Sequence, residues 1–106
     1  MKKSDLVVIN LDRPRYLRFG HKALKTLTAL TNMDITNMDM TNFSLEDLEK
    51  VLYSGLLSDA RENGETLKLD EMEDLLDQAD SFKEIMEKLQ EAFEKSFGPG
   101  TGEEKN

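Results

Sequence analysis

Residues 16–30, YLRFGHKALKTLTAL, constrain the fold most, because the spacing of their apolar residues changes in the middle. Before Gly20, the segment YLRF alternates and is rich in aromatic residues, which is typical of a β-strand. After Gly20, the apolar residues follow one face of a helix, at Ala23, Leu24, Leu27 and Leu30. Glycine suits the junction because the chain has to turn sharply there. A strand followed at once by a helix leaves an apolar face of each uncovered, so the remaining chain must cover both.

A partner strand is expected just before this stretch. Residues 6–11, LVVINL, form an apolar run that Asp12, Arg13 and Pro14 separate from a strand at residues 15–19. Asp and Pro favour turns, through side-chain bonding to the backbone and a fixed φ. Because an isolated hairpin is only marginally stable in water, helices are expected to pack behind it.

The first helix is expected at about residues 21–31, and two more follow from capping residues and apolar periodicity. One begins after Ser44 and spans about residues 45–61. It contains Gly55, which costs about 1 kcal/mol relative to alanine in a helix, and we attribute this glycine to close packing. A shorter helix is expected over residues 70–79, with its first and fourth residues as a second capping pair. The acids of this helix are interpreted as solvated surface that also suits the helix dipole.

The last helix is predicted over residues 82–97 and separates apolar from charged residues most clearly. Ser81 and Glu84 form a third capping pair at its start. Its apolar face is either buried in the core or open to a partner protein. The candidate partner-binding residues on this face are Met86, Leu89, Phe93 and Phe97.

Residues 31–43 repeat the pattern TNMDI, TNMDM, TNF, whose five-residue period fits neither a helix nor a strand. We interpret them as short helical turns and a connector, with a methionine-rich contact surface as the alternative. The tail at residues 98–106, GPGTGEEKN, has no apolar residue and is expected to be disordered. The sequence thus predicts one mainly α-helical α+β domain at residues 1–97, an N-terminal β-hairpin followed by about four helices, and a disordered tail at 98–106.

Catalytic, metal-binding and cofactor-binding patterns are missing from the sequence. The chain has no cysteine, which excludes disulfides, thiolate metal sites and cysteine nucleophiles. Its one histidine, His21, has no partner in the sequence for catalysis. Residues 59–70 resemble a calcium loop in length, but Arg61 stands at the third ligand position and Asp70 replaces the final glutamate. We therefore expect a protein without enzymatic activity, without a metal and without a cofactor.

Charge is distributed unevenly along the chain. The net charge is −8, but residues 1–25 hold seven basic and two acidic residues, while residues 26–106 hold seven basic and 20 acidic ones. An acidic body repels phosphates, so nucleic acid is not an expected partner. Head-to-tail self-association or a basic partner fits this asymmetry, and a solvated surface without a partner stays open. No apolar run approaches the ~20 residues of a membrane span, and the run LVVI is too short for a signal peptide.

Several segments, taken in order, resemble the tail assembly chaperones of long-tailed bacteriophages and prophages. These segments are YLRFG at residues 16–20, ALKTL at 23–27, LEDL at 45–48, YSGLL at 53–57 and the helix at 82–97. The resemblance covers roughly residues 6–97. The TNMDI repeat departs from the short glycine-containing connection usual in this family.

The resemblance implies a chaperone that binds the tape measure protein, keeps it soluble and helps to recruit tail tube subunits during tail assembly. It also implies a place in the host cytoplasm, absence from the finished virion, and in some members a longer form made by frameshifting. The tape measure protein would be the main partner, with the tail tube protein and a second copy of the chain as further partners. The alternative is a small acidic regulatory protein that mimics nucleic acid and binds a basic DNA- or RNA-binding protein.

Overall fold

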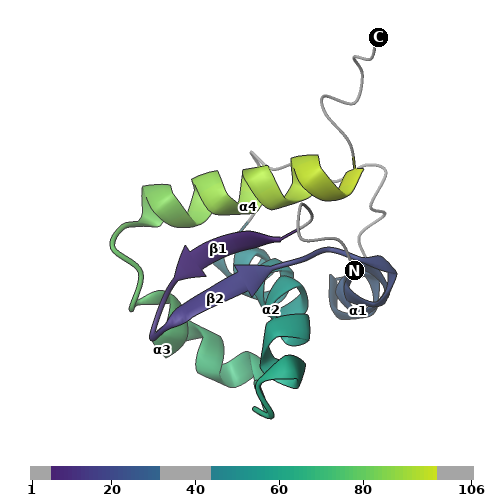
Figure 1. The fold of residues 1–106 in the computed structure, drawn as a ribbon, viewed down its shortest axis with the longest axis horizontal. Coiled ribbons are helices and arrows are strands. Elements are labelled where there is room, and N and C mark those ends of the chain that lie inside the picture. Colours follow the sequence, from purple (N-terminus) through teal and green to yellow (C-terminus); the bar gives the residue numbers. More distant parts are fainter. Residues whose placement is uncertain (1–5, 32–43, 98–106) are drawn as a thin grey trace, which may run out of the picture.

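The predicted hairpin forms from two antiparallel strands, β1 (Val7–Asn10) and β2 (Pro14–Leu17) (Figure 1). The computed structural model describes residues 6–31 and 44–97, with the side chain of Phe97 left out. The strands are shorter than expected, and β2 begins one residue early, at Pro14. A proline is tolerated at this first position, at the end of the ladder opposite Asn10. The predictions for residues 32–43 and 98–106 lie outside the described residues.

One face of the hairpin belongs to the core. Val7 pairs with Leu17 and Ile9 pairs with Arg15, and all four side chains are buried on this face. The opposite face carries Val8, which is 55% exposed. This alternation is the two-residue period expected for a sheet with one covered face.

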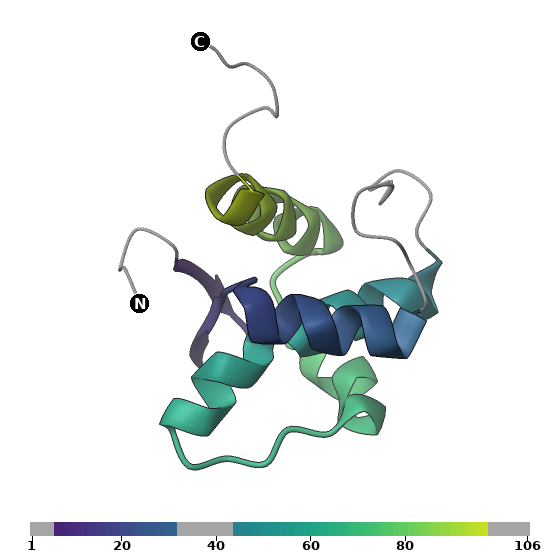
Figure 2. The ribbon, with the colours of Figure 1, turned by 90° about the vertical axis from the view of Figure 1, so that its right-hand side faces the viewer.

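Two helices follow in the predicted places, α1 (His21–Thr31) and α2 (Leu45–Glu62). The side-chain oxygen of Ser44 accepts a hydrogen bond from the Asp47 N–H at 3.0 Å, so the predicted cap of α2 is confirmed. Figure 2 shows α1 lying across α2, and the buried residues Ala23 and Leu27 fill the contact from α1. This packing covers the apolar face that the sequence left open after Gly20.

The prediction of a helix over residues 70–79 is wrong in the length of the helix and in the residues said to cap it. The chain instead forms a 3-10 turn, η3 (Leu69–Glu71), and a short helix, α3 (Met72–Leu76). Neither Asp70 nor Glu73 acts as a side-chain cap, because the residue in the capping position of η3 is Lys68. A lysine side chain has no acceptor for the free backbone N–H groups, and six acids between residues 70 and 80 repel one another. Only Met72 and Leu75 of this segment are buried.

The last helix, α4 (Phe82–Phe97), runs over the hairpin with the predicted bounds (Figure 1). Its start is capped as expected, since the Ser81 hydroxyl accepts a hydrogen bond from the Glu84 N–H at 3.1 Å. Its buried residues are Ile85, Leu89, Ala92 and Phe93. Over the described residues the chain therefore forms one two-stranded hairpin followed by four α-helices, a mainly helical α+β domain.

Gly55 is the point where hairpin and helices meet. The Arg18 N–H donates a hydrogen bond of 2.9 Å to the Gly55 carbonyl oxygen in the middle of α2. A Cβ atom on Gly55 would stand 2.6 Å from the Cζ atom of Phe19. The Phe19 ring also contacts Phe93 of α4, with ring centroids 4.6 Å apart. The predicted packing role of Gly55 is confirmed, and its neighbour is the aromatic ring that ends the hairpin.

We expect Gly55→Ala to lower the free energy of unfolding by about 1–3 kcal/mol, the usual cost of overpacking a core. This expected loss is opposite in sign to the effect of helix propensity, which favours alanine over glycine by about 1 kcal/mol. The Phe19 ring is 2% exposed and cannot move away. Urea unfolding followed by circular dichroism measures the change. In a Phe19→Leu background the same substitution should be neutral or stabilising, and an equal loss in both backgrounds would contradict the contact.

Candidate functional site

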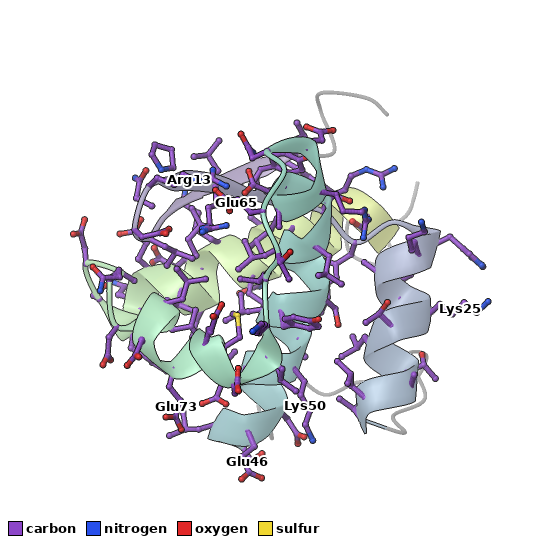
Figure 3. All side chains as sticks on the ribbon, turned by 90° about the horizontal axis from the view of Figure 1, so that it is seen from below. Arg13, Lys25, Glu46, Lys50, Glu65 and Glu73 are labelled. Carbon is purple, nitrogen blue, oxygen red and sulfur yellow. The ribbon has the colours of Figure 1, made fainter. Side chains whose placement is uncertain are left out.

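A cluster of ion pairs joins the hairpin turn to the end of α2. An Nη2 atom of Arg13 donates to Asp59 at 2.7 Å and to Glu65 at 3.0 Å. Arg15 donates to Asp12 through Nε at 2.8 Å and to Glu65 through Nη1 at 3.0 Å. Figure 3 shows the Arg13 and Glu65 side chains meeting at one end of the molecule.

The ion pairs of this cluster stabilise the fold. The side chains of Arg15 and Asp59 are only 6% and 4% exposed, and they lie 3.4 Å apart. Buried charges of this kind are tolerated when each has several partners, as both have here. Arginine and carboxylate groups that neutralise one another leave no free base or nucleophile. We assign the cluster to fixing the hairpin against α2, and nothing in the sequence indicates that residues 12–15 meet residues 59–65.

An open groove at the other end of the domain is the candidate binding site. It lies between the first turns of α2, the segment containing α3, and the start of α4, and it has a volume of about 470 Å³. Its apolar lining residues are Leu45, Leu48, Leu76, Ala79, Phe82 and Ile85. Leu45 is 68% exposed and Phe82 is 56% exposed, which is unusual for side chains of this size.

The rim of the groove is acidic. Glu49, Glu73 and Asp77 line it, and no basic side chain stands among its described lining residues. Glu46 of α2 and Glu73 of α3 project from the same end of the molecule (Figure 3). Burial, followed by the nearby Glu73 and Glu46 carboxylates, raises the pKa of the Glu49 carboxyl above its ordinary value. A positive charge placed at this rim would therefore interact favourably with several carboxylates at once.

The candidate partner-binding residues of α4 that the structure describes differ in how far they are buried. Leu89 is fully buried and Phe93 is 8% exposed, on a helix that packs over the hairpin. Met86 is half-buried at the edge of the core. The side chain of Phe97 lies outside the described part of the chain. A partner that touches Leu89 or Phe93 would first have to separate α4 from the hairpin, so contact through these residues stays a prediction.

The sequence contains a signal for the groove that is separate from the helical spacing of its apolar residues. Both capping serines, Ser44 and Ser81, are followed directly by a large apolar residue, Leu45 and Phe82. The first residue of a helix lies at its end, where neighbouring elements cover less of it. Two helices that begin with the same pattern bring two exposed apolar side chains to one place.

Other candidate sites find no support among residues 6–31 and 44–97. His21 is exposed at the start of α1, where it lines a shallow, mainly apolar hollow together with Leu24 and Lys25. No group of three or more acids or histidines within those ranges is arranged to hold a metal ion. No helix in that part of the chain is long and apolar enough to cross a membrane.

Comparisons with protein-family models, with curated proteins and with solved structures found no match to this chain. The resemblance to tail assembly chaperones therefore rests on the order of the segments quoted from the sequence.

The ion-pair cluster predicts how stability depends on acid pH. The hydrogen bond from Arg13 holds the pKa of Glu65 below its ordinary value, and the hydrogen bond from Arg15 does the same for Asp12. Because the unfolded chain takes up these protons first, the stabilisation is present at neutral pH and is lost as the pH falls.

We expect the free energy of unfolding to fall between about pH 5 and pH 3, and to fall less in the variant Asp12→Asn/Glu65→Gln. Urea unfolding at a series of pH values measures both slopes. The matched control, Glu91→Gln/Glu94→Gln, removes two exposed carboxylates of α4 and should keep the wild-type slope. An unchanged slope in the cluster variant would show that the cluster does not govern acid stability.

Proposed function

We propose that this protein is a non-enzymatic tail assembly chaperone of a long-tailed bacteriophage or prophage, which binds the tape measure protein and keeps it soluble. It would act in the host cytoplasm, help to recruit tail tube subunits and be absent from the finished virion. The proposal starts from the resemblance of the quoted segments, and one structural observation supports it most.

That observation is the convergence of three of the resembling segments on one point. Phe19 comes from YLRFG, Gly55 comes from YSGLL, and Phe93 comes from the helix at 82–97. These residues are far apart in sequence, yet the Phe19 ring contacts both of the others. Segments that share a core contact in this way form one structural unit, which supports treating the resemblance as one that extends over the domain.

The surface also suits a chaperone for a long helical client. The acidic charge of the domain favours solubility of a coated complex. An open apolar groove offers a place where an apolar helix face can be kept from water.

Co-expression tests the proposed function. We expect the tape measure protein encoded beside this chain to remain in the supernatant after high-speed centrifugation when the two are produced together, and to sediment when it is produced alone. An unrelated acidic protein of similar size is the control for charge and expression load. Equal sedimentation with and without this chain would contradict the proposal.

A further inference from the structure

The groove between α2, α3 and α4 combines an exposed apolar floor with a carboxylate rim. Leu45 and Phe82 supply large apolar surface to it, while Glu49, Glu73 and Asp77 surround that surface. Its volume of about 470 Å³ falls within the range of ~300–1,000 Å³ typical of ligand pockets. Such a site holds apolar side chains and prefers neighbours of positive charge.

The lining excludes one common way of binding a peptide. Its described lining residues come from α2, α3, α4 and the connection between α3 and α4, and none of them belongs to β1 or β2. A bound segment therefore finds no strand edge in the groove to extend. Docking of an amphipathic helix between helices needs only apolar side chains at helical spacing, and it fits this lining.

Two occupants from this chain itself fit the groove poorly. Residues 32–43 precede α2 directly, but they contain Asp34 and Asp39 and no basic residue, so the carboxylate rim repels them. The outer face of α1 is basic through Lys25, yet it offers only the half-buried Leu24 and the small Ala29 as apolar contacts. A second copy docking through α1 would leave much of the groove unfilled.

We propose that the groove formed by Leu45, Phe82, Glu49 and Glu73 binds a basic amphipathic helix of a client protein, with large apolar residues on one face and Lys or Arg beside them. This inference rests on the proposed function, because it names the surface through which such a chaperone holds its client. The apolar residues of the client helix fill the groove, and its cations pair with the rim. The raised pKa of Glu49 agrees with the acidic lining of the groove, which has no basic side chain among its described residues.

The probe is a fluorescein-labelled peptide of leucine and lysine whose leucines are spaced to form one helix face, and fluorescence anisotropy measures its Kd for the full chain. Two control peptides accompany it. One carries glutamate in place of lysine, and the other has the same composition in a scrambled order without an apolar face. We expect the amphipathic lysine peptide to bind at least about tenfold more tightly than either control. Equal binding of all three peptides would overturn the proposal.

Variants of exposed residues locate the site without disturbing the core. Leu45→Ser/Phe82→Ser should weaken binding of the peptide by about tenfold or more, the loss typical of central apolar contacts. Val8→Ser removes a similarly exposed apolar residue from the outer face of the hairpin and should leave Kd unchanged. Glu49→Gln/Glu73→Gln should weaken binding, while the charge-matched Glu91→Gln/Glu94→Gln on α4 should not. Equal effects of groove and control variants would overturn the proposal.

Three further outcomes would also overturn it, each in favour of another occupant or site. Binding that appears only after residues 32–43 are replaced by glycine and serine would mean that this segment fills the groove. A dimer or chain of copies in light scattering that Leu45→Ser/Phe82→Ser abolishes would assign the groove to a second copy. Binding that is lost at high salt but ignores Leu45 and Phe82 would indicate an acidic surface that mimics nucleic acid.

The two proposals fail separately. If Leu45→Ser/Phe82→Ser still keeps the tape measure protein in the supernatant during co-expression, the chaperone function stands and the groove is not its client site. If the tape measure protein sediments even with the wild-type chain, the proposed function fails whatever the peptide does.

Discussion

The contact between the Phe19 ring and Gly55 is the constraint on which the rest of this domain depends. A glycine in the middle of α2 lets the end of the hairpin approach the helix closely enough for the Arg18 N–H to reach the Gly55 carbonyl oxygen. The ring then lies between α2 and α4 and meets the Phe93 ring at a tilt of 52°. Hairpin, α2 and α4 are thus held together by one aromatic side chain, and the ion-pair cluster at Arg13 and Asp59 fixes the hairpin turn to the far end of α2.

This arrangement decides which apolar surface is available to a partner. Because Phe93 contacts Phe19, most of the apolar face of α4 belongs to the core. The first residues of α2 and α4 lie beyond that contact, and the short α3 leaves Leu45 and Phe82 uncovered. The same features that stabilise the fold therefore leave a groove at one end, lined by carboxylates and, in the described part of the chain, by no basic side chain.

Much of the fold could be predicted from the sequence, because local signals were strong. The helices beginning at Leu45 and Phe82 followed from their serine caps, and the reason for Gly55 followed from its cost in a helix. The prediction for residues 70–79 was wrong because it followed the spacing of the apolar residues. That spacing does not reflect the repulsion between the acids of this segment or the lack of a side-chain cap. The groove and the ion-pair cluster could not be predicted, since each joins residues from segments that only tertiary packing brings together.

The central claim is that α4 stays packed on the hairpin while the groove holds the client. Hydrogen exchange measured by mass spectrometry on the free chain and on its complex with the tape measure protein tests this most directly. The account predicts slower exchange in the complex at residues 45–50, 72–77 and 82–86, with residues 89–96 unchanged. Faster exchange at residues 89–96 in the complex would show that α4 leaves the hairpin to expose Leu89 and Phe93, and would contradict the account.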